Sequence, residues 1–188
     1  MEEKLRAALR SAIAFLEEHG YRYAIIGGIA SQYWGRVRST LDVDIKVLAP
    51  HTDYSEAREA IRAAFPERAR PELPANPLIV DTKVDDIVVD FLLAIPGYEE
   101  NIFNRAVLSE LDGIRAWICS AEDLIIQKAV ANRARDWDDI EGILIEQRVE
   151  LDQFHIERWL QEFAEALERP AVLDQYHSLV ERLANIRK

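Results

Sequence analysis

The 188-residue sequence is poor in the side chains that form disulfides and zinc sites. Its single cysteine, Cys119, excludes an internal disulfide, and the apolar stretch IRAWICS around it predicts a buried side chain rather than a nucleophile. The four histidines are scattered without paired spacing, which disfavours a zinc site or a histidine-based catalytic triad.

The sequence also lacks long apolar runs. No run approaches the roughly 18 to 20 residues that span a bilayer. The first 20 residues alternate charged and apolar side chains at helical spacing, unlike the uninterrupted apolar core of a signal peptide. We therefore expect a cytoplasmic protein with no membrane partner, whose length fits one domain or one domain with a small appendage.

Positive charge is scarce relative to negative charge. The chain has 23 Lys and Arg against 34 Asp and Glu, which gives a formal net charge of −11. This balance repels extended phosphate chains and disfavours broad, sequence-independent binding to nucleic acid unless basic residues gather locally. Any phosphate chemistry must therefore take place in a local pocket.

Strand and helix patterns are mixed in the first two thirds of the chain, and the last third is helical. A helix near 29–35 follows the first predicted strand, and the capping box SAED at Ser120 opens the helical last third. This order predicts an α/β or α+β fold with a helical C-terminal part. The predicted strands are 21–28, 42–49, 78–83, 85–95 and one near 113–118.

Residues 27–44, GGIASQYWGRVRSTLDVD, combine a glycine pair with arginines and two aspartates. Gly27 and Gly28 end a strand before a helix, where glycine lets the backbone approach a ligand and helix N–H groups favour phosphate. Asp42 and Asp44 project to the same side of the next strand. The alternation of polar and apolar residues alone is more typical of a half-buried strand with a polar outer side than of a binding site. Further residues must decide between these two interpretations.

Asp90, within IVVDFLLA, is the deciding residue. A carboxylate in a strand that is apolar on both sides costs several kcal/mol to bury as an unpaired ion, so it must be partnered, protonated or bound to metal. One alternative is an aspartate bonded to the backbone or to an arginine. The other is a third carboxylate that converges with Asp42 and Asp44.

Three converging carboxylates repel one another unless divalent cations neutralise them. Magnesium suits such a site because it prefers hard oxygen ligands and keeps waters that substrate phosphates can replace. Two ions about 3.5 to 4 Å apart can activate an attacking hydroxyl and stabilise a pyrophosphate leaving group. The pattern therefore indicates phosphoryl or nucleotidyl transfer.

The order of Gly-Gly, a gap of thirteen residues, Asp-Val-Asp and a later Asp in an apolar strand resembles the DNA polymerase beta-like nucleotidyltransferase superfamily. The resemblance implies a mixed sheet flanked by helices, with residues 1–119 as the nucleotidyltransferase core and 120–188 as a helical region packed on it. It implies two Mg²⁺ ions, with Mn²⁺ as the alternative metal. The implied catalytic and metal-binding acids are Asp42, Asp44 and Asp90.

Further positions are expected to bind the nucleoside triphosphate. Gly27 and Gly28 form the turn that grips it, and Ser31 adds a hydroxyl in the first helical turn. If the strand begins early, Arg36, Arg38 and Thr40 share the face of the aspartates. The expected nucleotide-binding residues are Gly27, Gly28, Ser31, Arg38, Thr40 and Lys128, with Arg36, Arg135, Asp136 and Asp139 as secondary candidates.

Within the superfamily, the run from Arg38 to Asp44 and the segment SAEDLIIQKAVANRARDWDDI are similar to the abortive-infection (AbiEii-type) nucleotidyltransferase toxins. Those proteins carry a helical lysine followed by an Arg-Asp-x-x-Asp step, which here falls on Lys128, Arg135, Asp136 and Asp139. Two alternatives remain open. Lys128 can extend from an apolar stripe to the surface, and Arg135 with Asp136 can form a surface pair.

The leading interpretation is a metal-dependent enzyme that transfers a nucleoside monophosphate from an NTP to an acceptor hydroxyl. The acceptor is an RNA end, a protein or a small molecule, and the protein would be the toxin of a toxin-antitoxin or phage-defence system, with an antitoxin as a possible partner. One alternative is an aminoglycoside-type nucleotidyltransferase, whose cationic acceptor suits the acidic charge. Another is a non-catalytic nucleotide-binding or antitoxin-pairing module of the same fold.

Overall fold

The computed structural model describes residues 1–35, 39–49, 53–147 and 150–186. Arg36 and Arg38, two of the expected site residues, lie outside the described residues. The chain divides into two compact units. The sheet unit comprises Met1–Ala30 and Arg38–Cys119, and the helical unit comprises Ser31–Val37 and Ser120–Lys188.

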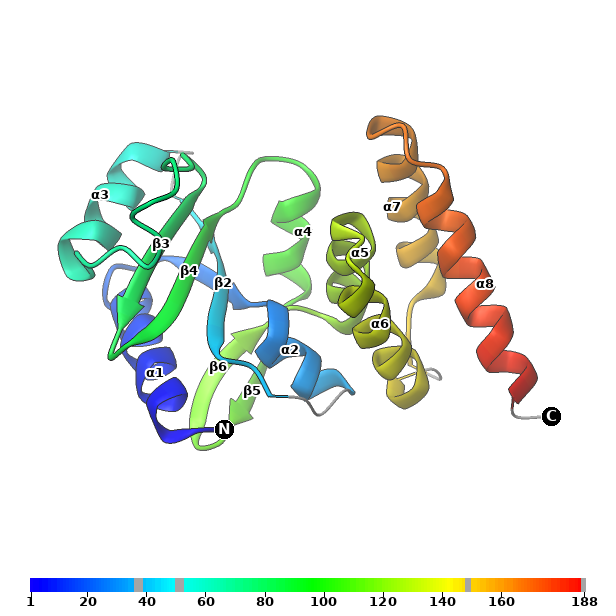
Figure 1. Cartoon of the computed structure of the whole chain (residues 1–188), viewed down its shortest axis with the longest axis horizontal. Helices are drawn as coiled ribbons and strands as arrows, with labels where there is room; N and C mark the ends of the chain where they lie inside the picture. Colours follow the sequence, from blue (N-terminus) through cyan, green and yellow to red (C-terminus); the bar gives the residue numbers. More distant parts are fainter. Residues whose placement is uncertain (36–38, 50–52, 148–149, 187–188) are drawn as a thin grey trace. The chain divides into compact units, whose positions relative to one another are not determined.

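The sheet unit contains a mixed sheet of six strands in the order β3-β4-β2-β1-β6-β5 (Figure 1). The pairs β2·β4 and β1·β6 are parallel, and the other three pairs are antiparallel. The strands are β1 (Arg22–Ile25), β2 (Asp42–Leu48), β3 (Ile79–Val84), β4 (Ile87–Leu93), β5 (Val107–Leu111) and β6 (Ile114–Ile118).

One face of this sheet is apolar and fully covered. It consists of alternate residues of the strands, such as Val43 and Ile45 of β2 and Phe91 of β4, all of which are completely buried. Helices α1 (Glu3–Glu18) and α3 (Tyr54–Ala64) pack on this side. Each fully buried side chain of this size contributes about 1.5 to 3 kcal/mol, so this face holds the sheet and its helices together.

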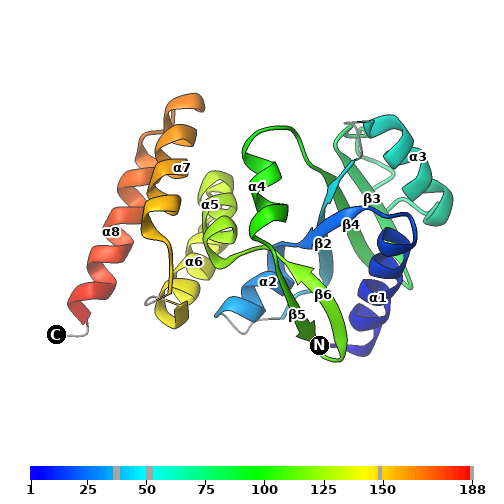
Figure 2. The same cartoon turned by 180° about the vertical axis from the view of Figure 1, so that it is seen from behind.

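Helix α4 (Tyr98–Arg105) lies on the opposite side of the strands from α1, as Figure 1 and Figure 2 both show. Arg22 contacts this helix through Asn104 at 3.0 Å. Tyr23 and Ile25 lie on the other face of β1 and are buried. The face toward α4 is also the face of Asp42 and Asp44, because they alternate with Val43 and Ile45.

Two hairpins close through two-residue turns with positive φ at both residues. The β3-β4 turn is formed by Asp85 and Asp86, and the β5-β6 turn by Asp112 and Gly113. Such turns match the twist of the strands and favour Asp and Gly. The strands predicted at 78–83 and 85–95 form the first of these hairpins. The sequence did not predict β5 (Val107–Leu111), because VLSEL is only five residues long and the Asp-Gly pair after it is the main local signal of that hairpin.

The helical unit is built from α5 (Ala121–Ala131), α6 (Ala134–Gln147), α7 (Gln153–Ala166) and α8 (Ala171–Ile186), with the second half of α2 (Gly27–Trp34). The Ser120 hydroxyl accepts a hydrogen bond from the Asp123 N–H at 3.1 Å, which confirms Ser120 as the N-cap of α5. Gly35 lies against the backbone of α6, since a Cβ there would lie 2.6 Å from the Gly142 carbonyl oxygen.

The fold class predicted from the sequence is confirmed: a mixed sheet flanked by helices, followed by a helical C-terminal part. Helix α2 begins at Gly27, two residues earlier than expected. Cys119 is buried, as predicted. The division into a core of 1–119 with helices packed on it stays a prediction. No helix of the described ranges is both long and apolar enough to cross a membrane.

Candidate functional site

Three aspartates lie side by side on the polar face of the sheet. In the register of the strands, Asp44 of β2 pairs with Asp90 of β4, and Asp90 pairs with Asp81 of β3. Paired residues on adjacent strands project to the same side, about 4.5 to 5.5 Å apart. We call Asp44, Asp90 and Asp81 the acidic row. Asp42 lies two residues before Asp44 on the same side of β2.

The glycine turn contacts the acidic row directly. Strand β1 ends at Ile25, and the next N–H, of Ile26, donates to the Asp44 carbonyl oxygen at 3.0 Å. Gly27 has φ +63, and a Cβ placed on it would lie 1.9 Å from Asp44 Oδ2. Only glycine therefore allows this approach, because any side chain would overlap the carboxylate. The buried Gly28 follows in the first turn of α2.

Asp42 is oriented by a neighbouring hydroxyl. Thr40 Oγ1 donates to Asp42 Oδ1 at 2.8 Å, and Thr40 is only 8% exposed. In this arrangement Thr40 positions one carboxylate of the acid pair. Its expected role in nucleotide binding stays a prediction.

Asp90 is paired with an arginine. Arg70 donates from both terminal nitrogens to the two Asp90 carboxylate oxygens, at 2.7 and 2.9 Å. These hydrogen bonds raise the pKa of the Arg70 guanidinium, and the nearby charges of Asp81 and Asp42 raise it further. Asp90 thus adopts one of the two alternatives left open by the sequence, an aspartate bonded to an arginine.

Sequence reasoning missed Arg70. It lies in the proline-rich connection 66–77, PERARPELPANP, where no periodicity indicates which side chain turns toward the sheet. The only available signal was indirect, since a carboxylate in an apolar strand requires a partner. Lys46 was missed as well. It is buried two residues after Asp44 and forms an ion pair with Glu99 of α4.

Asp81, a member of the acidic row, holds the 66–77 loop through hydrogen bonds. Its carboxylate accepts hydrogen bonds from the Arg70 N–H at 2.8 Å and from the Arg68 guanidinium at 3.2 Å. Arg68 also donates to the Leu73 carbonyl oxygen at 3.1 Å, which closes the loop on itself. Burial raises the pKa of Asp81, but the hydrogen bonds from Arg70 and Arg68 lower it overall.

The donor chemistry of Asp42, Asp44 and Asp90 fits magnesium, because all three offer carboxylate oxygens from one side of two adjacent parallel strands. Among the described residues, however, no group of three or more His, Cys, Asp or Glu side chains is arranged to hold a metal ion. Thr40 and Arg70 engage the oxygens of Asp42 and Asp90, so a guanidinium neutralises part of the site.

The helical unit gathers four of the expected site residues. Lys128 Nζ lies 2.7 Å from Asp139 Oδ2 and 3.6 Å from Asp136 Oδ1, and Ser31 Oγ donates to Asp139 Oδ2 at 3.4 Å. Arg133 Nε completes the group with a hydrogen bond of 2.6 Å to Asp136. We call these five residues the lysine cluster.

The lysine cluster corrects two alternatives raised by the sequence. Lys128 does not extend to the surface, since its side chain is only 6% exposed. Asp136 does not form a surface pair with Arg135, because Asp136 is buried and its arginine partner is Arg133. Arg135 itself is exposed. Whether any of these residues contacts a nucleotide stays a prediction.

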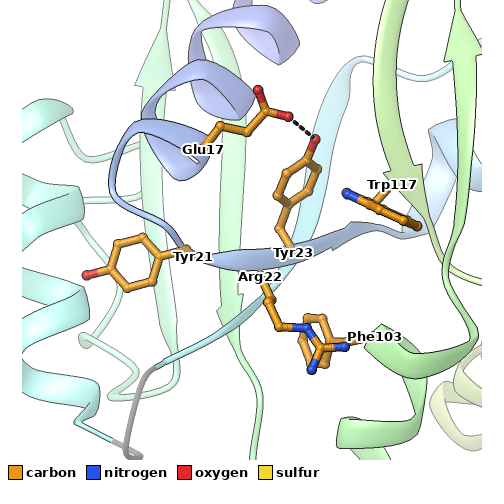
Figure 3. Close-up of a pocket in the computed structure, with 6 residues that line it drawn as sticks. All are labelled: Glu17, Tyr21, Arg22, Tyr23, Phe103 and Trp117. Atoms are coloured by element: carbon orange, nitrogen blue, oxygen red, sulfur yellow. Dashed lines mark hydrogen bonds between the residues drawn. The ribbon is translucent and has the colours of Figure 1, made fainter.

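Two pockets of the sheet unit differ in their relation to the acidic row. The first has a volume of about 240 Å³ and is drawn in Figure 3, where Tyr23 points to Glu17 and Arg22 lies over the Phe103 ring. It contains none of the expected site residues. The second, of about 320 Å³, is lined by Arg68, Arg70, Leu73, Pro74, Asn76, Ile79 and Asp81.

Solved structures share this fold. An antigenic nucleotidyltransferase-like protein from Paracoccidioides brasiliensis is 14% identical with a TM-score of 0.55, and the match covers 93% of this chain and 94% of that one. The antibiotic-resistance factor ANT(2'')-Ia is 18% identical with a TM-score of 0.51, covering 100% of this chain and 97% of that one.

Identities this low establish the fold alone, and no protein of curated function matches the sequence. The family assignment comes from the sequence itself. Residues 5–175 match the family described as nucleotidyl transferase of unknown function (DUF2204), so the chain belongs to this nucleotidyl transferase family.

Proposed function

We propose that the protein is a magnesium-dependent enzyme that transfers a nucleoside monophosphate from a nucleoside triphosphate to an acceptor hydroxyl. Membership of the nucleotidyl transferase family supports the reaction class. The observation that carries the assignment of the site is the contact between the glycine turn and the acidic row. Gly27 brings the start of α2 against Asp44, which lies in register with Asp90.

Each part of this arrangement has a chemical task. The N–H groups at the start of α2, beside Gly27 and Gly28, bind the phosphates that will leave as pyrophosphate. Asp42, Asp44 and Asp90 would hold two divalent ions, which when bound neutralise the charge on the phosphates. The acceptor oxygen forms a bond to the α phosphorus as the bond to the bridging oxygen breaks, and a carboxylate takes the hydroxyl proton.

The second part of the proposal concerns the class of molecule that accepts the nucleoside monophosphate. The sequence resemblance to abortive-infection toxins favours an RNA end or a protein as acceptor and a role in toxin-antitoxin or phage defence. We also propose a cytoplasmic location. The net charge of −11 favours a second candidate, a cationic small molecule. For an RNA acceptor, the same charge predicts contact at an end only, with weak non-specific affinity that falls as salt rises.

Labelled nucleotides test the reaction class. We expect label at the α position, supplied with Mg²⁺, to move to one acceptor among bulk transfer RNA, aminoglycosides and cell protein, and label at the γ position to leave as pyrophosphate. The variant Asp44→Asn serves as the control for contaminating activity. Transfer of γ label alone would contradict nucleotidyl transfer, because it requires a different bond to break.

A further inference from the structure

Both oxygens of the Asp90 carboxylate are used by one cation, the Arg70 guanidinium. The same guanidinium lies within electrostatic range of Asp81 and Asp42, so a single positive charge serves several carboxylates of the polar face. Like charges this close repel one another unless a cation lies among them. Arg70 is the cation at Asp90, and Arg68 is the cation at Asp81.

The Arg70 side chain can leave Asp90 without disturbing the loop that carries it. The loop backbone is fixed by Asp81, which accepts hydrogen bonds from the Arg70 N–H and from the Arg68 guanidinium. Neither contact involves the Arg70 side chain. That side chain is 37% exposed and lines the cavity of about 320 Å³ beside β3, which offers room for a different rotamer.

Two cations cannot use Asp90 in the same way at once. A bidentate guanidinium occupies both carboxylate oxygens, and a divalent ion on either oxygen would repel it at short range. The pair is also partly exposed to water, where a salt bridge contributes only about 1 kcal/mol or less. A divalent ion therefore needs little free energy to replace it.

We propose that Arg70 and a divalent metal ion alternate as the cation of Asp90, so that metal binding moves Arg70 off the carboxylate into the adjacent cavity. This inference rests on the proposed function, since it assumes that Asp90 is a metal ligand. Arg70 is thus a built-in competitor for the metal. It neutralises Asp90 when no metal is bound, and it sets the metal concentration at which the site fills.

Calorimetric titration with Mn²⁺ tests the exchange on the full chain. Arg70→Gln removes the competitor, and we expect it to tighten Mn²⁺ binding by about three- to fivefold, in keeping with the small contribution of a partly exposed pair. Arg70→Lys keeps the charge but loses the two-pronged contact, so its effect should be intermediate. Lys4→Gln is the matched control, because it removes an equal charge from the same unit, from an exposed pair with Asp86, without touching Asp90 or the 66–77 loop. It should change the affinity less than about twofold.

The outcomes separate the two proposals. Equal tightening in Arg70→Gln and Lys4→Gln, or weaker binding in Arg70→Gln, would show that Arg70 acts through general charge or supports the site, and would overturn the exchange. Absence of Mn²⁺ binding in wild type and in every variant would overturn the proposed metal site and the exchange with it.

A second readout follows the side chain itself. In a nitrogen-15 spectrum, the Arg70 Nε–Hε signal is identified as the one missing from Arg70→Lys. We expect it to shift as Mg²⁺ is added to saturation, and the Arg68 signal to stay in place. An Arg70 signal that does not move while Mn²⁺ still binds would overturn the exchange. Melting temperatures of all variants confirm that each is folded.

Discussion

The sheet unit and the helical unit each pair a basic side chain with aspartates, but they expose these pairs to water very differently. In the sheet unit, the side chains of Arg70 and Asp90 are 37% and 14% exposed. In the helical unit, those of Lys128 and Asp139 are 6% and 1% exposed. Water can replace the partners of the first pair but not those of the second.

This difference separates a charge pair that a ligand can exchange from one that holds a structure together. Breaking a buried ion pair leaves an uncompensated charge in a low dielectric, whereas breaking an exposed pair exchanges one set of contacts for water. Lys128 therefore contributes first to the packing of α5 on α6, and Arg70 contributes to the chemistry of the acidic row.

The largest expected effect follows from removal of the buried ion pair between Lys128 and Asp139. Lys128→Met leaves Asp139 without its cation, and we expect a loss of about 3 to 5 kcal/mol in the free energy of unfolding, measured by urea denaturation. Lys83→Met is the control, because Lys83 pairs with Glu67 at the surface at 3.2 Å and should contribute less than about 1 kcal/mol. Similar losses in the two variants would show that the buried Lys128 pair stabilises the fold no more than a surface ion pair does.

The next effect concerns Asp42 and Asp44 and should appear as a loss of transfer activity without a loss of stability. Asp42→Asn and Asp44→Asn are expected to lower transfer by at least about a hundredfold, equal to about 2.7 kcal/mol of transition-state stabilisation. The melting temperature without metal should stay the same or rise, since a repelling carboxylate is removed. Full transfer activity in either variant would place the metal site elsewhere.

A smaller loss of stability is expected at Gly27, and it tests whether the glycine turn contacts Asp44. Gly27→Ala should cost about 2 kcal/mol or more in stability and abolish transfer, because its Cβ would overlap Asp44 Oδ2. Gly20→Ala is a matched control, with φ +68 and nothing within 4 Å of the added Cβ. It should cost only about 1 kcal/mol and leave transfer unchanged. Equal effects would mean that backbone strain alone, and no contact with Asp44, explains the Gly27 result.

The smallest effect is the pH dependence contributed by Asp81. Its pKa is lowered from the ordinary value of 3.8 in the folded protein, so its stabilising contribution is present above about pH 4 and is lost as pH falls through the folded pKa. We expect the melting temperature of wild type to exceed that of Asp81→Asn at pH 6, with the gap closing toward pH 3. A gap that stays constant would show that Asp81 contributes by packing only.

The parts of the fold that sequence predicted are those set by local pattern. Alternation in DVDIKVLA and the apolar run around Asp90 predicted β2 and β4, and the glycine pair predicted the turn into α2. The motif thereby indicated correctly that Asp42 and Asp44 share a face. Their roles as metal ligands stay predictions.

The parts that sequence did not predict depend on contacts between distant residues. Arg70 lies twenty positions from Asp90 in a loop without periodicity, and its approach follows from the way Asp81 fixes the loop backbone. The burial of Lys128 depends on the packing of α6, which a single helix pattern does not reveal. Composition and spacing describe neighbours along the chain, and these pairs are neighbours only in space.

The burial of Cys119 gives the protein a natural kinetic reporter. Its N–H donates to the Ile25 carbonyl oxygen at 3.0 Å, directly after β6, and its thiol is shielded from solvent. A thiol reagent in solution can react only when this part of the β1-β6 pairing opens. Because the chain has one cysteine, the rate of labelling measures that opening at a single site, without an engineered probe.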